Sequence, residues 1–289
     1  MSGRPRRPGY GGTVRWRSFV AVGDSFTEGL DDPDPSGNGY RGWADLVAHT
    51  LAARAAGFQY ANLAVRGRLF PQVADEQVPR ALSMAPDLVS FAAGGNDALR
   101  RGFDPDRLLP RFERIVASFR EAGADVILFQ FADVTRRLPG RRVIGPRAEV
   151  LNRAAREIGE RYGARVIDLW SDDEFANPAL WSVDRLHLAP AGHRRVAAHV
   201  LTALGITPDP QWWHVPPVPR QRWVAARVAD VRWAGQHLAP WIVRRLTGRS
   251  SGDLVTAKRP TLSPVLQGDP LREGSAVADR DVADRDVTA

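Results

Sequence analysis

Four short motifs in this chain carry side chains that together could perform nucleophilic catalysis. The first is Gly23-Asp24-Ser25-Phe26-Thr27-Glu28-Gly29, which directly follows an apolar run. A hydroxyl on a turn that enters a helix lies beside backbone N–H groups, and these stabilise negative charge. Taken alone, the segment fits a nucleophile and a simple Asp/Ser helix cap about equally well.

Two further motifs offer groups that can donate hydrogen bonds to a negatively charged oxygen. In Asn62-Leu-Ala-Val-Arg-Gly67, the glycine lets the backbone approach a ligand and donate its N–H. In Ala93-Gly-Gly-Asn96-Asp97, the side-chain amide of Asn96 could face a developing oxyanion. Each of these motifs, considered by itself, is more simply explained as a turn.

The fourth motif, Asp184-Arg-Leu-His187, pairs a carboxylate with an imidazole. An Asp three residues before a His can meet it across one tight turn, hold one ring nitrogen protonated and leave the other free as a base. Pro190 begins the next helix, so the pair stays in the preceding loop. A lone Asp/His pair is usually structural, but here a candidate nucleophile and two oxyanion donors accompany it.

Short apolar runs alternate with longer amphipathic stretches and predict the elements that position these motifs. The expected strands are 18–22, 59–65, 87–93, 125–131 and 165–169, and the expected helices lie near 41–56, 70–83, 105–122, 146–162 and 190–204. Consecutive Val, Ile, Leu and Phe in the strands indicate burial on both faces. This order predicts an α/β fold, a three-layer α/β/α sandwich with a five-stranded parallel sheet. Ligand sites in such sheets form at the carboxyl ends of strands, where three of the motifs lie.

Together, the four motifs resemble the SGNH hydrolase family, also called GDSL esterases and lipases. The resemblance covers roughly residues 18–204, and the four signature residues of the family fall on Ser25, Gly67, Asn96 and His187, with Asp184 three residues before the histidine. Phe26 stands where the naming pattern has Leu, which is a similar apolar residue.

The resemblance implies the flavodoxin-like form of this fold and a serine hydrolase that cleaves carboxylic esters. His187, oriented by Asp184, would take the proton of Ser25, and the N–H groups of Ser25 and Gly67 with the Asn96 side chain would form the oxyanion hole. Asp24 and Gly95 would support this site, Asp24 by shaping the turn. No cofactor or metal is required, and the six histidines show no metal-ligand spacing.

Two alternatives remain open at this point. A thioesterase or a carbohydrate O-deacetylase would use the same machinery. A non-catalytic binding or scaffold protein would act through the C-terminal extension and carry a vestigial site, but the complete set of five site residues argues against it.

The composition limits the partners. Zero cysteines exclude disulfides, thiolate metal sites and a cysteine nucleophile. The net charge of +7 lies in the tails, because residues 18–208 carry 23 basic and 24 acidic side chains. We therefore expect no nucleic acid partner, and the small-molecule ester substrate is what the resemblance implies. Lys258 is the only lysine, and codon bias is the simplest explanation for the dominance of arginine.

These charges divide the chain into four expected segments: a basic N-terminal arm (1–17), the SGNH hydrolase domain (18–208), a Trp/Arg-rich helical extension (209–249) and a disordered tail (250–289). The extension holds five of the nine tryptophans and seven arginines. Docking on the domain or on a second subunit is favoured over peripheral attachment to a membrane. Without an apolar stretch of about 18 residues or a signal-peptide core, a cytoplasmic location is expected.

Several other polar and aromatic residues are weaker candidates for the site. His193 and His199 on the last helix and Trp43 on the first are interpreted as packing or surface residues. The arginine-rich segment 136–147 is interpreted as a solvated loop rather than a site for an anionic substrate.

Overall fold

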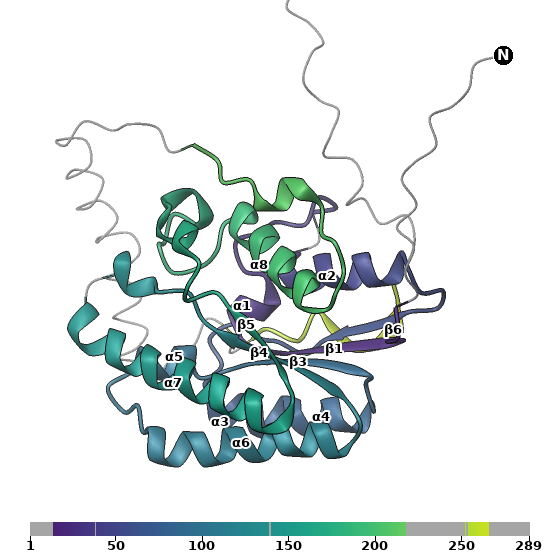
Figure 1. Ribbon diagram of the computed structural model, residues 1–289, viewed down its shortest axis with the longest axis horizontal. Coiled ribbons are helices and arrows are strands. Elements are labelled where there is room, and N and C mark those ends of the chain that lie inside the picture. Colours follow the sequence, from purple (N-terminus) through teal and green to yellow (C-terminus); the bar gives the residue numbers. More distant parts are fainter. Residues whose placement is uncertain (1–13, 38, 139, 218–251, 253, 266–289) are drawn as a thin grey trace, which may run out of the picture.

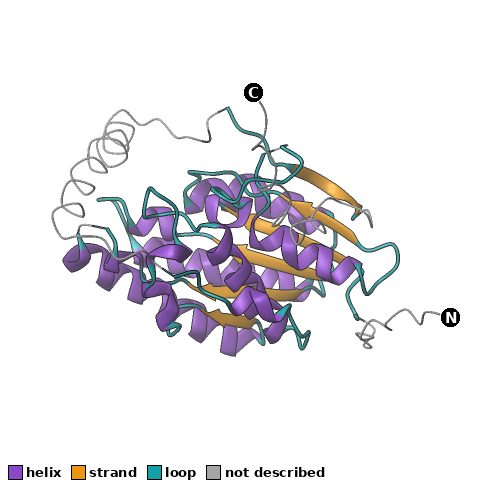
Figure 2. Ribbon diagram, turned by 90° about the horizontal axis from the view of Figure 1, so that it is seen from above, coloured by secondary structure: helices purple, strands orange, loops and turns teal. Residues whose placement is uncertain are grey.

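A mainly parallel sheet passes through the middle of the domain in the computed structural model (Figure 1). The structure describes residues 14–37, 39–138, 140–217, 252 and 254–265. Among these residues the sheet has six strands in the order β5-β4-β3-β1-β2-β6, and Figure 2 shows them as one twisted sheet. The strands are β1 (Ser18–Gly23), β2 (Gln59–Asn62), β3 (Leu88–Ala92), β4 (Asp125–Gln130), β5 (Arg165–Asp168) and β6 (Arg259–Pro264). The first five are mutually parallel and confirm the predicted fold class.

The sixth strand corrects the prediction of a five-stranded sheet. β6 pairs antiparallel with β2, with Gln59 opposite Pro264 and Asn62 opposite Arg259. It comes from the segment 250–289, so the prediction of disorder is wrong for residues 259–264. The strand was not predicted because it contains prolines at 260 and 264 and few apolar residues. An edge strand tolerates proline because one side of it makes no ladder hydrogen bonds.

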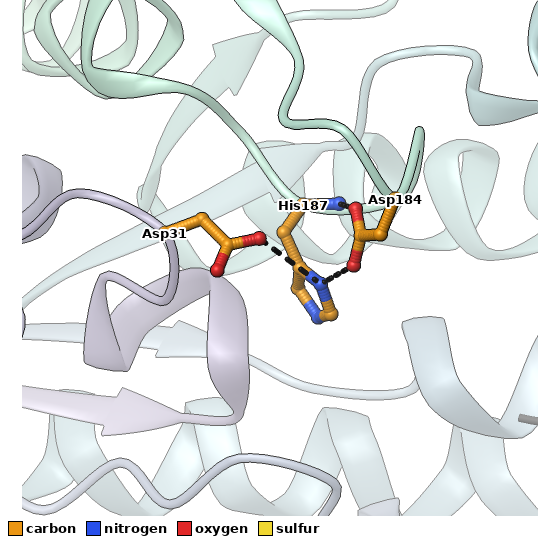
Figure 3. A group of neighbouring side chains, drawn as sticks. All are labelled: Asp31, Asp184 and His187. Carbon is orange, nitrogen blue, oxygen red and sulfur yellow. Dashed lines mark hydrogen bonds and ion pairs between the residues drawn. The ribbon is translucent and has the colours of Figure 1, made fainter. Parts of the chain in front are cut away.

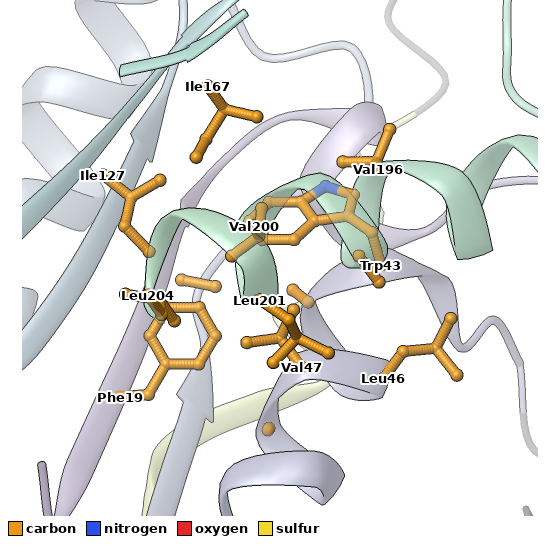
Figure 4. Close-up of a cluster of buried hydrophobic side chains, with 14 of the residues drawn as sticks. Phe19, Trp43, Leu46, Val47, Ile127, Ile167, Val196, Val200, Leu201 and Leu204 are labelled. Carbon is orange, nitrogen blue, oxygen red and sulfur yellow. The ribbon is translucent and has the colours of Figure 1, made fainter. Parts of the chain in front are cut away.

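One face of the sheet is covered by α2 (Gly42–Ala52) and α8 (Pro190–Ala203). Figure 4 shows Trp43, Val47 and Val200 of these helices beside Phe19 and Ile127 of the sheet. All five side chains are fully buried. The interpretation of Trp43 as a core residue is therefore confirmed.

The other face is covered by helices that lie on the opposite side of the sheet from α2 and α8 in Figure 1. They are α3 (Phe70–Gln72), the π-helix η1 (Val73–Gln77), α4 (Val78–Ser83), α6 (Pro105–Glu121) and α7 (Arg141–Tyr162). In α6, the buried residues Leu108, Phe112, Ile115 and Phe119 recur at three- and four-residue steps and form one apolar stripe. Asp104 caps this helix by accepting the N–H of Arg107.

Helix α7 begins at Arg141, five residues before its predicted start. Pro146 favours a helix start at its own position because proline suits the first turn. Here it lies inside the first two turns, where it removes only the hydrogen bond to the carbonyl of Arg142. The segment 136–147 is therefore not a solvated loop throughout, and Ile144 within it lines a pocket.

Short helices lie in the connections between the strands and the long helices, and one, η5, follows α8. They are α1 (Ser25–Glu28), α5 (Gly95–Ala98) and the 3-10 helices η2 (Val134–Arg136), η3 (Asp173–Ala176), η4 (Pro178–Leu180) and η5 (Pro210–Trp213). No helix in the described part of the chain is both long and apolar enough to cross a membrane.

Both predicted arms contact the domain where they are described. Trp16 is buried and donates its indole N–H to Asp125. Trp213 of η5 stacks edge-on against His199 and accepts a hydrogen bond from Arg195, so η5 packs on α8. Residues 1–13 of the arm and 218–249 of the predicted extension lie outside the described residues.

The helix that carries Ser25 is pressed against α2 at two glycines. Gly29 ends α1 with φ 92°, and Gly42 begins α2 with φ 80°. A Cβ at Gly42 would lie 2.3 Å from Cα of Gly29. The Asp32 carboxylate fixes this contact by accepting the N–H of Gly42 and two N–H groups of Arg41.

We expect Gly42→Ala to lower the free energy of unfolding by about 2–5 kcal/mol, through the positive φ and the clash together. Gly57→Ala is the matched control, because Gly57 has φ 73° but nothing within 4 Å of its Cβ position. It should lose only about 1–2 kcal/mol. Urea unfolding of both variants measures the difference, and equal losses would contradict the close contact.

Candidate active site

The order of the strands places the candidate site at one point on the sheet edge. β1 and β3 are neighbours, but the connection after β1 runs through α2 on one face and that after β3 through α6 on the other. Such a switch point opens a crevice at the carboxyl ends of the strands. Ser25 begins α1 directly after β1, and Asn96 lies in α5 directly after β3.

Ser25, His187 and Asp184 form a continuous line of hydrogen bonds in this crevice. The His187 Nε2 lies 3.1 Å from the Ser25 Oγ, and its Nδ1 lies 2.5 Å from the Asp184 Oδ2. The other carboxylate oxygen of Asp184 accepts bonds from the Ser182 hydroxyl and from the N–H groups of Leu186 and His187. The turn 182–187 thereby fixes the carboxylate before it meets the imidazole.

The charges of this pair reinforce its geometry. Burial raises the pKa of Asp184, but the hydrogen bond and the positive charge of His187 lower it more, so the net pKa lies well below the usual value. Burial lowers the pKa of His187, but Asp184 raises it more strongly, with Asp31 and Asp24 adding to this, and the net pKa is raised. With Nδ1–H held by the carboxylate, Nε2 of the neutral ring is the acceptor that faces the Ser25 hydroxyl.

A second carboxylate, which the motifs did not indicate, also faces the histidine. The Asp31 Oδ2 lies 3.9 Å from the His187 Nδ1, on the side of the ring away from Asp184 (Figure 3). Asp31 has φ 69° in the loop after α1, a segment with no periodic pattern that could have marked it. Among the described residues, these three form the only group with potential metal-ligand atoms within 4.8 Å, and Nδ1 is already bonded to Asp184.

Asp24 and Asn96 form the other side of the crevice. Asp24 caps α1 by accepting the N–H of Phe26, and its second oxygen accepts the Asn96 Nδ2 at 3.0 Å. The same Nδ2 donates to the carbonyl of Arg68 at 3.1 Å. Both N–H groups of the amide are thus engaged. Burial raises the pKa of Asp24 to about 6, although the Phe26 N–H opposes the shift.

The predicted glycines lie on two separate turns, and Gly95 but not Gly67 is among the residues that line the pocket beside Ser25. Gly67 has φ 73° and follows Arg66, whose backbone N–H donates to the Glu28 carboxylate at 2.6 Å. The Arg66 guanidinium also binds this carboxylate and lies over the ring of Tyr40. Gly95 begins α5 and lines the pocket beside Asn96. Glu28 therefore joins the helix of Ser25 to the turn of Gly67.

An apolar pocket of about 130 Å³ opens beside Ser25 and His187. Its apolar walls come from α1, the segment after β4, α7 and the loop before α8: Phe26, Leu30, Phe131, Ala132, Val134, Ile144, Ala148, Leu151, Leu169, Phe175, Trp181, Leu186 and Leu188. Asn152 fixes one wall, because its amide accepts the N–H and binds the carbonyl of Phe131. No motif in the sequence marks this asparagine.

Two further histidines of the described residues, His193 and His199, pack against neighbouring elements of the domain. His193 is 1% exposed, accepts the N–H of Trp43 at Nδ1 and donates from Nε2 to the Leu30 carbonyl. Burial lowers its pKa to about 4, so the ring is neutral. His199 binds the Asp172 carboxylate. The interpretation of both as packing residues is confirmed.

The chain matches the family model of the GDSL-like lipase/acylhydrolase family over residues 21–195. It belongs to this family and is a hydrolase of the SGNH type, which confirms the resemblance seen in the motifs. The uncharacterized protein YpmR of Bacillus subtilis (strain 168) is 35% identical over 121 residues, which cover 36% of this chain. These residues cover 46% of YpmR, less than half the length of that relative.

Solved structures share the fold. TesA superposes with a TM-score of 0.54 at 23% identity, over 65% of this chain and 97% of that one. LAE5, an α/β hydrolase enzyme from the metagenome of Lake Arreo, Spain, gives 0.58 at 22% identity, over 70% and 100%. A catalytic mutant of Axe2, an acetylxylan esterase from Geobacillus stearothermophilus, gives 0.57 at 19% identity, over 72% and 100%.

We expect Asp31→Asn to lower the pKa of His187, because it removes a negative charge that stabilises the imidazolium. Asp184→Asn should lower it further, since Asp184 is the stronger influence. Asp34→Asn is the control from the same loop, where Asp34 binds Ser36. NMR titration of the His187 ring protons measures all three, and equal values for Asp31→Asn and wild type would contradict the influence of Asp31.

Proposed function

We propose that this hydrolase cleaves carboxylic esters that carry an apolar acyl group, with Ser25 as nucleophile and His187 as base. The observation that carries the proposal is the unbroken line from Asp184 through His187 to Ser25, which ends at an apolar pocket. A serine hydroxyl at hydrogen-bond distance from an oriented imidazole is the arrangement that nucleophilic acyl transfer requires.

In the first step, His187 Nε2 takes the proton of Ser25 as Oγ bonds to the ester carbonyl carbon. The carbonyl oxygen becomes an oxyanion, which the N–H groups of Ser25 and Gly67 would bind. Asn96 joins them by exchanging one of its two present hydrogen bonds for one to the oxyanion. The carbon–oxygen bond to the alcohol then breaks, and the alcohol leaves with the proton of His187.

In the second step, water replaces the alcohol. His187 takes a proton from the water as the water oxygen attacks the carbonyl carbon of the acyl-enzyme. The bond from this carbon to the Ser25 Oγ then breaks, His187 returns the proton to Oγ, and the carboxylic acid leaves. Asp184 remains a carboxylate throughout, because its pKa is far below the usual value, and it stabilises the imidazolium in both steps.

We expect Ser25→Ala to lower the hydrolysis of p-nitrophenyl esters by at least about 10³-fold, because the nucleophile is lost. Wild type should be labelled at Ser25 by a fluorophosphonate probe, and the variant should not. Ser36→Ala, which alters an exposed serine in the loop after α1, is the control and should retain wild-type rates. Equal rates in wild type and Ser25→Ala would refute the proposed nucleophile.

The apolar pocket predicts a preference among acyl chains. Each methylene buried in it should raise kcat/KM about fourfold, from about 0.8 kcal/mol per CH₂, until the pocket is full. Ala148→Phe should abolish this gain, because Ala148 lines the pocket. Val143→Phe, on the same helix but 55% exposed, should preserve it. A series of p-nitrophenyl esters from acetate to decanoate measures the slope, and a flat wild-type series would contradict an acyl site.

Acetylated sugars and acyl thioesters, assayed beside the same series, separate the alternatives that the motifs left open. A carbohydrate O-deacetylase would prefer acetyl on sugar over any longer acyl chain, and a thioesterase would favour thioesters over oxygen esters of equal length. A scaffold protein with a vestigial site would neither hydrolyse the esters nor accept the fluorophosphonate.

A further inference from the structure

Lys258 comes from the segment that carries β6, far along the chain from the other residues around the candidate site. We propose that Lys258 is a positioning residue that holds the single-turn helix of Ser25 and, through Glu28, the turn of Gly67. This inference rests on the proposed function, because it concerns the placement of the nucleophile and of an oxyanion donor.

The Lys258 ammonium lies in a cluster of oxygen atoms at the end of α1. It donates to the carbonyls of Glu28 at 2.6 Å, Tyr40 at 3.0 Å and Arg41 at 2.5 Å, and it also binds the carboxylate of Asp45. The last carbonyls of a helix lack partners within the helix, so an outside donor must satisfy them. Lys258 supplies that donor to Glu28, the last residue of α1.

The chemistry of lysine suits this place. An ammonium is a compact charge with three donors on a flexible stem, so it can serve oxygens that converge on one point. A guanidinium presents its donors as a planar fork, which suits a carboxylate better than a ring of carbonyls. Every other cationic side chain in this sequence, apart from histidine, is arginine, and the one lysine lies where arginine fits poorly.

A second path links Lys258 to the same helix. Asp45, its carboxylate partner, hydrogen-bonds the hydroxyl of Tyr60, and this hydroxyl accepts the Asn62 Nδ2 at 3.0 Å. Asn62 also donates to the carbonyl of Thr27 at 2.9 Å. Two successive carbonyls of α1, those of Thr27 and Glu28, are therefore held by one connected network.

The network continues to the turn of Gly67. The Glu28 carboxylate binds the backbone N–H and the guanidinium of Arg66, the residue before Gly67. Gly252, on the same C-terminal segment as Lys258, approaches this turn so closely that a Cβ there would lie 2.0 Å from the Arg66 carbonyl oxygen. The C-terminal segment thus contacts both the end of α1, through Lys258, and the turn of Arg66 that the Glu28 carboxylate binds, through Gly252.

Positioning from outside matters because α1 is very short. Ser25 and Glu28 are its first and last residues, and a single turn makes too few internal hydrogen bonds to be stable alone. A shift of the Ser25 Oγ or of the Gly67 N–H would leave substrate binding intact but misplace the groups that meet the tetrahedral intermediate. Displacements of about 1 Å can cost up to about 100-fold in rate.

The test uses the full chain and three variants, Lys258→Met, Lys258→Met/Asp45→Asn and Arg80→Met. Lys258→Met leaves Asp45 buried without its cation and should lose stability as well as activity. The double variant removes that unpaired charge and should recover most of the wild-type Tm. If Lys258 positions α1, the kcat of the double variant stays at least about 10-fold below that of wild type, with KM nearly unchanged. A boronic acid that forms a tetrahedral adduct with serine should bind the double variant more weakly than wild type, by a factor similar to the loss in kcat.

Arg80→Met is the matched control, because Arg80 binds the carbonyl of Pro260 on the same strand and does not touch the network. It should keep wild-type kcat. Recovery of kcat together with Tm in the double variant, or unchanged boronic acid binding, would overturn the positioning role. Failure of the proposed function is a separate result, because it would appear as equal activity in wild type and Ser25→Ala whatever Lys258 does.

Discussion

The hydrogen bond between the Ser25 hydroxyl and the His187 imidazole joins residues 162 positions apart, and much of the domain is arranged to keep them 3.1 Å apart. Ser25 is placed by β1 and by the contact between Gly29 and Gly42, and His187 by the turn before α8. The elements that place Ser25 and those that place His187 share one hydrophobic core, because α2 and α8 pack on each other and on the same face of the sheet. The buried cluster around Trp43 therefore sets the distance between the Ser25 hydroxyl and the His187 imidazole.

Asp24 and Asp45 are buried and Asp184 is half-buried, and each of these carboxylates is stabilised in a different way. Asp184 faces the imidazole and keeps a low pKa, whereas Asp45 faces the ammonium of Lys258. Among the described residues no cation is hydrogen-bonded to Asp24, whose carboxylate instead accepts the Phe26 N–H and the Asn96 amide. Its raised pKa of about 6 reflects this weaker compensation. Below that pH, Asp24 takes up a proton, and Asn96 loses an ionised acceptor.

The sequence was sufficient for the parallel strands and for the residues that converge on the crevice, because both depend on local patterns and on the rule that strand ends share an edge. It was insufficient where the role of a residue is set by distant contacts. Asp31 lies in an irregular loop, and Asn152 looks like any polar residue on a helix. β6 was missed because an edge strand needs main-chain pairing more than an apolar pattern. Lys258 is visible in the sequence only as the single lysine among many arginines. Codon bias explains the arginines but does not explain why this one position is lysine.

The antiparallel strand β6 also affects the order in which the domain can be completed during synthesis. All five parallel strands and α8 precede residue 204, whereas Lys258 and β6 follow more than fifty residues later. At about 5–20 residues per second, a ribosome adds that stretch in roughly 3–11 seconds. During this interval the nascent domain has an open edge at β2 and an uncompensated Asp45. The translation delay therefore separates synthesis of the five parallel strands from synthesis of the segment that completes the sheet and pairs with Asp45.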